Sequence, residues 1–212
     1  MGLIAVFDFD GTLIKRDSMV LFFLKHFRFS FLDLYIFFKI AVHAVRFFLK
    51  SYSRKRFKEI YLNLVIRLSG FRENKDAIEI FSDYLYGIIF PGAVKEINRL
   101  KKKGYKTILL SASPDLYLDD LGKTLGFSKV ICTRTTDEDG VIRIKGLNCY
   151  GKDKIKMFLG EISREEINWD LSYCYSDSPS DSELLGMFGN PYIVNNKGFA
   201  KRSIGMKHVN WK

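Results

Sequence analysis

The chain contains little cysteine and little proline, and both shortages limit what kind of protein it is. Three cysteines are scattered through 212 residues, at Cys132, Cys149 and Cys174, and no two of them form a C-x-x-C pair. This spacing argues against a disulfide framework and a zinc knuckle, and predicts buried, reduced thiols. With four prolines and no repeated or low-complexity segment, no linker is evident, so we expect one core with a small inserted module.

Long uncharged apolar runs are also absent, which argues against a membrane span. The most hydrophobic region, 19–49, is interrupted by charges before any run reaches the ~18 residues that a span requires. The interrupting residues are Lys25, Arg28, Asp33, Lys39 and Arg46. No secretory leader is expected, because the first residues pass directly into an apolar strand. The expected location is the cytoplasm, with peripheral contact at the inner membrane surface left open.

Acidic residues are scarce relative to basic ones, and the imbalance is concentrated in one region. The chain has 34 Lys and Arg against 24 Asp and Glu, a formal net charge of +10. Between residues 18 and 70, ten basic residues stand against Asp33 and Glu59, together with thirteen Phe and Tyr. Such a charge attracts anions, among them nucleic acids, anionic lipids and phosphorylated small molecules. A hydrophobic share of 47% predicts that the chain is nevertheless globular.

The stretch A-V-F-D-F-D-G-T-L, residues 5–13, organises the rest of the chain. An apolar run ending at Phe7 leads directly into Asp8, Asp10 and Gly11. A short continuous apolar run bounded by a turn signal predicts a strand buried on both faces of a parallel sheet. The two carboxylates then lie at the carboxyl end of that strand, where open α/β sheets bind ligands. The simpler alternative is that Asp8 and Asp10 only form a turn around Gly11.

Beyond this motif the chain alternates between helical and strand patterns. Residues 18–86 show a helical periodicity that predicts three or four helices, with breaks near Ser30, at 51–53 and at 70–74. The later predictions are a helix at 93–103, a strand at 106–110, a helix at 114–125, a strand at 130–133, a hairpin turn at 137–140, a helix at 152–159, a strand at 171–175, a short helix at 181–188 and a last strand at 192–194.

Strands that alternate with helices indicate right-handed crossovers within one parallel sheet. The predicted fold is therefore α/β, with a Rossmann-like, mainly parallel sheet and helices on both of its faces. The helical block that follows the first strand is predicted to be an inserted all-α cap. The expected boundaries are 17–87 for the cap, and 1–16 together with 88–212 for the α/β core.

Polar residues follow three of the predicted strands. Asp8 and Asp10 end the first strand, Ser111 ends the second, and Asp177 follows a later one. Because the carboxyl ends of parallel strands share one edge, these side chains can converge there with Lys154, near the start of a helix. Their chemistry suits phosphoryl transfer. A carboxylate can attack phosphorus, hard oxygen ligands hold Mg²⁺, and a hydroxyl with an ammonium group can hold the phosphate oxygens.

Four segments, in this order, resemble the four motifs of the haloacid dehalogenase-like (HAD) phosphatases. They are D-F-D-G-T-L (8–13), L-L-S-A-S (109–113), G-K-D-K (151–154) and Y-S-D-S-P-S-D (175–181). The helical insertion after the first motif is similar to the cap of the phosphoserine-phosphatase-like branch. The resemblance covers essentially the whole chain, and it implies a phosphatase with an α/β core and a helical cap.

The resemblance implies a role for each acidic residue of the motifs. Asp8 is expected to be the nucleophile, and Asp10 the general acid that protonates the leaving alkoxide and then activates water. The carboxylates of Asp8 and Asp177 and the backbone carbonyl of Asp10 are expected to bind Mg²⁺. Asp181 is expected to support this site, although it is also a good helix N-cap.

The phosphate group itself is expected, from the same resemblance, to be held by three residues. These are the side chain of Ser111, the backbone amide of Ala112 and the ammonium group of Lys154. Lys152 competes with Lys154 for this role, because the start of a helix is uncertain by one or two residues. Ser111 has the alternative of being a turn residue at the end of a strand.

The substrate is less clearly indicated than the chemistry. Phosphoserine phosphatases carry a glutamate seven residues after the second aspartate of the first motif and read S-G-G in the second motif. This chain has Asp17 and S-A-S at those places. Its basic, aromatic-rich cap resembles that of bacterial phosphatidylglycerophosphatase C-type proteins instead. That likeness implies a lipid phosphate such as phosphatidylglycerophosphate, presented at an anionic membrane surface.

Other functions stay open. Aromatic stripes at helical spacing are usually a packed core, so the cap could be basic and aromatic without touching a membrane. The substrate could then be phosphoserine or another small phosphorylated metabolite. A catalytically inactive, basic binding module is a remoter alternative. Nucleic acid is not expected as a partner, because all four motifs retain their chemical groups.

Overall fold

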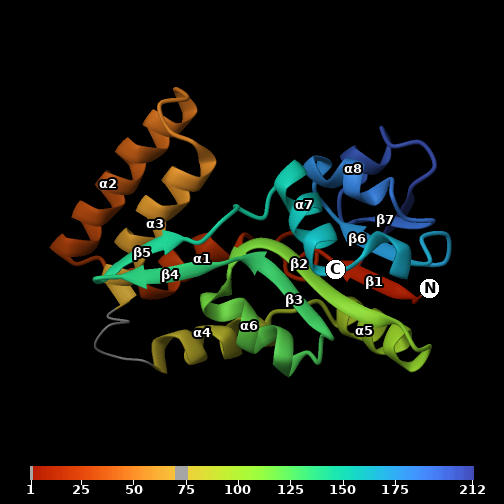
Figure 1. The fold of residues 1–212 in the computed structure, drawn as a ribbon. Helices are drawn as coiled ribbons and strands as arrows, with labels where there is room; N and C mark the ends of the chain where they lie inside the picture. The colour runs from red at the N-terminus through yellow and green to blue at the C-terminus, as the bar shows by residue number, and fades with distance from the viewer. Residues whose placement is uncertain (1, 70–75) are drawn as a thin grey trace.

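The computed structural model describes residues 2–69 and 76–212, and within them six parallel strands form one sheet (Figure 1). Their order across the sheet is β3-β2-β1-β6-β7-β8. The strands are β1 Ile4–Phe7, β2 Lys106–Pro114, β3 Lys129–Thr133, β6 Tyr173–Ser176, β7 Asn190–Val194 and β8 Lys207–Val209. The predicted α/β class is confirmed. The expectation that the strand near 192–194 is the last one is wrong, because β8 follows it and pairs with β7.

Helices lie on both faces of this sheet. They are α1 Ser18–His26, α2 Phe31–Phe48, α3 Arg54–Ser69, α4 Asp76–Gly87, α5 Pro91–Lys102, α6 Asp115–Thr124, α7 Lys152–Glu161, α8 Ser182–Leu185 and α9 Lys197–Ala200. Within the described ranges, no single helix is both long and apolar enough to cross a membrane. The pair α4 and α5 passes that test together, by length and composition only, but the two helices meet at 89°.

Successive side chains of a strand point to opposite faces of the sheet. Apolar side chains therefore lie on both faces, and helices cover both. Phe7 of β1 is buried in a cluster with apolar residues of α5 and α6. Its neighbour Val6 is buried in a second cluster, with apolar residues of α7 and α8. The central strand is therefore apolar on both sides, which is the continuous pattern that the sequence predicts.

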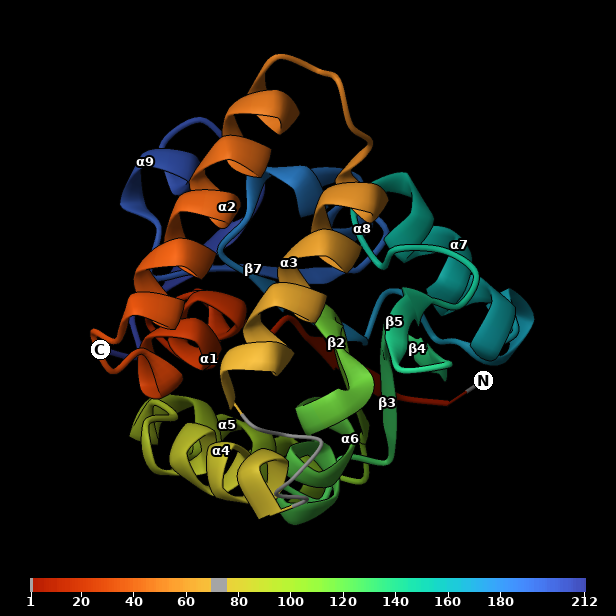
Figure 2. The ribbon, with the colours of Figure 1, turned by 90° about the vertical axis from the view of Figure 1, so that its left-hand side faces the viewer.

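Four helices, α1 to α4, lie in the described part of the insertion between β1 and β2. α2 begins at a capping box in which the Ser30 hydroxyl accepts from the Asp33 amide and the Asp33 carboxylate accepts from the Ser30 amide. α2 and α3 lie side by side (Figure 2). The predicted break at 70–74 lies outside the described residues.

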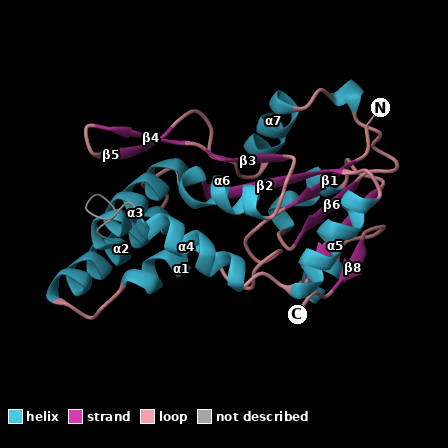
Figure 3. Cartoon of the chain, turned by 90° about the horizontal axis from the view of Figure 1, so that it is seen from below, coloured by secondary structure: helices cyan, strands magenta, loops and turns pink. Residues whose placement is uncertain are grey.

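Two elements lie across the expected boundary between cap and core. The antiparallel hairpin of β4 Thr135–Glu138 and β5 Val141–Ile144 extends from the core toward α3, where the Asn63 side chain hydrogen-bonds the backbone of Ile142 (Figure 3). Conversely, α4 packs against the core helix α6, with the rings of Phe81 and Tyr117 5.1 Å apart. The boundaries 17–87 for the cap, and 1–16 with 88–212 for the core, stay a prediction.

Candidate active site

One cavity of about 530 Å³ lies at the carboxyl ends of the central strands, between the sheet and the helical insertion. All seven residues predicted from the motifs line this cavity. They are Asp8, Asp10, Ser111, Ala112, Lys154, Asp177 and Asp181. The backbone fixes their arrangement, because the Asp8 amide donates to the Tyr175 carbonyl at 2.9 Å and so continues the pairing of β1 with β6 into the site.

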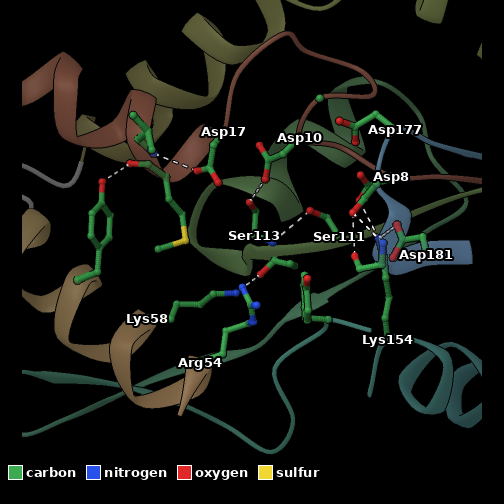
Figure 4. A pocket seen from close by; sticks show the side chains of 18 of the residues that line it. Asp8, Asp10, Asp17, Arg54, Lys58, Ser111, Ser113, Lys154, Asp177 and Asp181 are labelled. Carbon is green, nitrogen blue, oxygen red and sulfur yellow. Dashed lines mark hydrogen bonds and ion pairs between the residues drawn. The ribbon is translucent and has the colours of Figure 1, made fainter. Parts of the chain in front are cut away.

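A lysine and two carboxylates form the buried centre of the site (Figure 4). Lys154 Nζ lies 2.8 Å from Asp8 Oδ1 and 2.7 Å from Asp181 Oδ2, and the Lys154 side chain is only 4% exposed. Burial opposes the charge of Lys154, but the carboxylates of Asp8 and Asp181 outweigh it and raise the lysine pKa above its ordinary value. Burial also raises the pKa of Asp8, although Lys154 opposes that shift.

The geometry distinguishes the two candidate lysines. α7 begins at Lys152, whose side chain is exposed to solvent. Lys154 and Phe158 lie four residues apart on the buried side of the same helix. The structure therefore brings Lys154 into the site and leaves Lys152 outside it. Asp181 stands at the N-cap position of α8, but in the described structure its side chain makes no capping hydrogen bond and faces Lys154 instead.

Thr12 connects the first and last motifs. Its hydroxyl oxygen lies 3.3 Å from Asp8 Oδ2 and 3.3 Å from Asp177 Oδ1, and it accepts a hydrogen bond from the Asp177 amide at 2.9 Å. Gly11, with a φ of +76°, gives Asp177 its space, because a Cβ on Gly11 would lie 2.1 Å from Asp177 Oδ2. The side chains of residues 8 and 177 are thus close neighbours.

The carboxylates of Asp8 and Asp177 make a suitable place for a hard cation. Burial, followed by the charge of Asp8, raises the pKa of Asp177 to about 7, so that the pair carries unfavourable negative charge. A divalent ion would relieve that repulsion, and carboxylate oxygens are its preferred ligands. Across residues 2–69 and 76–212, no group of three or more His, Cys, Asp or Glu side chains could hold a metal, so a third protein ligand would be another kind of oxygen, such as a backbone carbonyl.

Asp10 points away from Lys154 into a separate hydrogen-bond network. Its Oδ2 accepts from the Ser113 hydroxyl at 2.5 Å, and its Oδ1 accepts from the Ser18 amide at 2.7 Å, at the start of α1. The Ser18 hydroxyl in turn contacts the hydroxyl groups of Ser113 and Tyr117. Burial, and then the nearby charge of Asp17, raises the pKa of Asp10 to about 7. A carboxyl group with such a pKa can both donate and accept a proton near neutral pH.

Ser111 and Ala112 lie on the loop-like end of β2. The register of β2 with β3 shifts between Ser111 and Pro114, which separates this segment from regular pairing. The Ser111 hydroxyl accepts a hydrogen bond from the Ser113 amide at 3.1 Å. The side chain and amide that were predicted to hold phosphate therefore come from the irregular end of β2, which the Ser111 hydroxyl stabilises locally.

Lys58 of α3 hydrogen-bonds the backbone of this end of β2. Its ammonium group donates to the Ala112 carbonyl at 2.6 Å and to Asn148 Oδ1 at 2.5 Å. Burial lowers the pKa of Lys58 to about 8. In the sequence Lys58 is only one of ten basic residues between residues 18 and 70, since a sequence does not tell which lysine of a basic run is buried.

The wall of the cavity opposite the acidic residues comes largely from the insertion and is mixed in character. Arg54 lies over the ring of Tyr150, with its guanidinium carbon 4.0 Å from the ring centre. Apolar side chains complete this wall, namely Met19, Val20, Phe47, Phe57 and Tyr61. The cavity therefore presents the four carboxylates and Lys154 on one side and a cationic, apolar surface on the other.

The fold and this arrangement define the class of protein. A family model described as "haloacid dehalogenase-like hydrolase" matches residues 5–186. This match spans most of the chain, so the chain belongs to the haloacid dehalogenase-like hydrolases. The predicted family and the prediction that the chain is an enzyme of this kind are confirmed.

Individual relatives match nearly the whole chain. "Protein CicA" of Caulobacter vibrioides is 29% identical over 215 residues, and the match covers 93% of this chain and 85% of that protein. A Mycobacterium tuberculosis protein named "Probable phosphatase Rv3661" is 24% identical over 204 residues, covering 94% of this chain and 71% of that protein.

Solved structures show the same fold at lower sequence identity. A protein of unknown function from Bordetella pertussis Tohama I superposes with a TM-score of 0.83 at 20% identity, covering 100% of both chains. A structure described as a phospho-aspartyl intermediate analogue of phosphoserine phosphatase superposes with a TM-score of 0.62 at 19% identity, covering 98% of this chain and 93% of the other. Both solved structures thus share the overall fold of this chain.

Proposed function

We propose that the protein is a Mg²⁺-dependent phosphomonoester hydrolase that acts through an aspartyl-phosphate intermediate on Asp8. The observation that carries the proposal is the convergence of Asp8, Asp10, Lys154 and Asp177 in one cavity at the edge of the sheet. A nucleophile, a proton donor, a phosphate-binding cation and a cation site are the parts that this reaction requires. The phosphatase name of a curated relative supports the same activity.

The two steps follow from the positions of the two acids. A carboxylate oxygen of Asp8 attacks phosphorus, a new O–P bond forms, and the ester O–P bond breaks. Protonated Asp10, whose pKa is about 7, gives its proton to the departing alkoxide. Asp10 then takes a proton from water as the water attacks the same phosphorus, which releases inorganic phosphate and restores Asp8.

Groups other than the two acids hold the phosphate oxygens. Lys154 lies 2.8 Å from Asp8 Oδ1 and can neutralise the negative charge that collects on the phosphoryl group. The Ser111 hydroxyl and the Ala112 amide add two neutral donors. Asp181, at 2.7 Å from Lys154, keeps that lysine charged and oriented.

The carboxylates of Asp8 and Asp177 and the backbone carbonyl of Asp10 would hold the Mg²⁺ ion. When bound, Mg²⁺ supplies positive charge that offsets the charges of the nucleophile and the phosphate. Thr12 fixes the two carboxylates relative to each other through its contacts at 3.3 Å.

We further propose that the substrate is a lipid phosphate such as phosphatidylglycerophosphate, met by peripheral contact with an anionic membrane from the cytoplasm. Arg54 and the apolar wall beside it suit a phosphate ester that carries further negative charge and apolar groups. The competing substrate is phosphoserine or another small phosphate, which the phosphoserine phosphatase fold supports. Asp17 and the S-A-S motif depart from that pattern.

Phosphate release separates these functions. Purified protein should release phosphate from p-nitrophenyl phosphate with Mg²⁺ and lose this activity with EDTA. Asp8→Asn protein is the matched control, and equal activity in that variant would overturn the mechanism. A screen of phosphatidylglycerophosphate in mixed micelles, phosphoserine and sugar phosphates then ranks substrates by kcat/KM. No phosphate release from any ester would favour an inactive binding module.

A further inference from the structure

Helix α2 exposes an apolar surface on the outside of the molecule. Its outward residues form a stripe of exposed apolar side chains, each 41–94% exposed, which we name the α2 stripe. They are Phe31, Leu34, Phe38, Val42, Val45 and Leu49. The spacings of three, four, four and three residues place the first five on one face of the helix, and Leu49, the C-cap residue, continues the series four residues later. Figure 1 shows α2 at the edge of the molecule, with α3 between it and the sheet.

The α2 stripe is not the packing face of the helix. The inner side of α2 already packs on the insertion, since Ile36 is buried and the ring of Phe47 stacks on Phe57 of α3 at 5.0 Å. The stripe adds a second, outward apolar face that this packing does not use. Six adjacent exposed apolar residues form a larger patch than the scattered ones usual on a soluble surface, and such patches mark interaction sites.

Basic residues border the stripe on one side. Lys39 and Arg46 each follow a stripe residue directly and lie seven residues apart, so they share one flank of the helix, and Lys50 follows at its end. All three are exposed. The acidic residue of α2, Asp33, is buried in its N-terminal cap. An apolar face with a purely cationic border is the pattern of a helix that lies in the interface of an anionic bilayer.

We propose that the α2 stripe docks on an anionic lipid surface, with α2 parallel to the membrane plane. Phe31, Phe38 and their neighbours enter the acyl boundary, while Lys39 and Arg46 meet lipid phosphates. The C-terminal end of α2 links this surface to the catalytic cavity, because Phe47 lines the cavity and the next residue, Phe48, is exposed. The purpose of docking, presenting a lipid phosphate to Asp8, rests on the proposed function.

Co-sedimentation with vesicles tests the docking. Wild-type protein should pellet with phosphatidylglycerol/phosphatidylcholine vesicles and far less with phosphatidylcholine alone. Phe38→Glu/Val45→Glu should lower the partition coefficient at least tenfold, because it places two carboxylates on the stripe. Leu171→Glu/Ile204→Glu is the matched control, since it also replaces two exposed apolar residues by glutamate, but at positions outside the helical insertion. Lys39→Gln/Arg46→Gln should lower partition to the anionic vesicles by about fivefold per cation.

Defined outcomes would overturn the docking. Wild-type protein that stays in the supernatant, or a stripe variant that pellets like wild type, contradicts it. A wild-type dimer in sedimentation velocity that the stripe variant dissociates would show that a second copy covers the face instead. Hydrolysis of p-nitrophenyl phosphate is measured on every variant. Hydrolysis without vesicle binding overturns the docking and the proposed membrane contact but leaves the phosphatase activity standing, whereas vesicle binding without hydrolysis overturns only the proposed phosphatase activity.

Discussion

Replacement of Lys154 by methionine removes the cation that two buried carboxylates share. Lys154 Nζ lies 2.8 Å from Asp8 and 2.7 Å from Asp181, and all three side chains are buried. Methionine has a similar length and no charge, so the change leaves Asp8 and Asp181 facing each other without a counter-charge. Because the pKa of Lys154 is raised in the folded state, the stabilisation it provides is complete below about pH 10 and is fully present at pH 7.

The expected loss is large in both stability and activity. Removal of one partner from a buried ion pair costs about 3–5 kcal/mol of unfolding free energy. In a chain of this length, that loss corresponds to about 6–20 °C in Tm. In catalysis, loss of a donor that holds the phosphoryl oxygens should remove about 2–4 kcal/mol of transition-state stabilisation. That loss corresponds to about 30- to 900-fold in kcat/KM.

Thermal unfolding and steady-state kinetics of Lys154→Met and Lys152→Met test the predicted losses of stability and of kcat/KM. Lys152→Met is the matched control, because Lys152 begins the same helix and is exposed, and it should change neither Tm nor kcat/KM. The stability deficit of Lys154→Met should shrink on acidification, since protonation of Asp8, whose pKa burial raises, removes uncompensated charge. A wild-type rate in Lys154→Met, or the predicted loss in Lys152→Met instead, would refute the reasoning.

Three further predictions concern the other parts of the site. With an alkyl phosphate, kcat/KM should fall as the pH rises through about 7, because burial raises the pKa of Asp10 to about 7 and only its protonated form supports departure of the alkoxide. p-Nitrophenyl phosphate, whose leaving group needs no proton, should give a flatter profile, and identical profiles would contradict the role of Asp10. Asp177→Asn should raise the Mg²⁺ concentration for half-maximal activity at least tenfold, whereas an unchanged Mg²⁺ titration would remove Asp177 from the metal site. Lys58→Met removes the buried ammonium group that donates to the Ala112 carbonyl and to Asn148 Oδ1, and leaves these two oxygens to share the single hydroxyl donor of Thr133, which costs about 1–3 kcal/mol. It should therefore lower Tm and raise the inhibition constant of inorganic phosphate, and a variant that changes only Tm would show that Lys58 is structural alone.

The sequence predicts those parts of the site in which a chemically distinctive residue directly follows a recognisable strand. Asp8 follows a fully apolar strand and Asp177 follows another strand. Because the carboxyl ends of parallel strands lie at one edge of a sheet, the sequence alone predicts that these two residues are neighbours. The choice between Lys152 and Lys154 needed the register of α7. One residue of shift in a helix turns a side chain by about 100°, which decides whether it faces the site or solvent.

Residues whose role depends on packing between distant segments were not predicted. Lys58 lies in the basic run 54–58, and only the packing of α3 against the end of β2 singles it out from Arg54 and its neighbours. Thr12 occupies a motif position but acts through Asp177, 165 residues away in the chain. β8 was missed because its short run, with Lys207 and His208 exposed, lacks the apolar pattern of a buried strand.

The central claim is that the carboxylate of Asp8 becomes covalently phosphorylated during turnover. The direct measurement is a rapid quench of enzyme with an excess of substrate, followed by borohydride reduction and tandem mass spectrometry of the peptide that contains residues 5–13. Borohydride converts an acyl phosphate to an alcohol, so residue 8 should be recovered in part as homoserine, only with substrate and Mg²⁺ present. Unmodified aspartate at residue 8 throughout steady turnover, or the same modification on another carboxylate, would contradict the account.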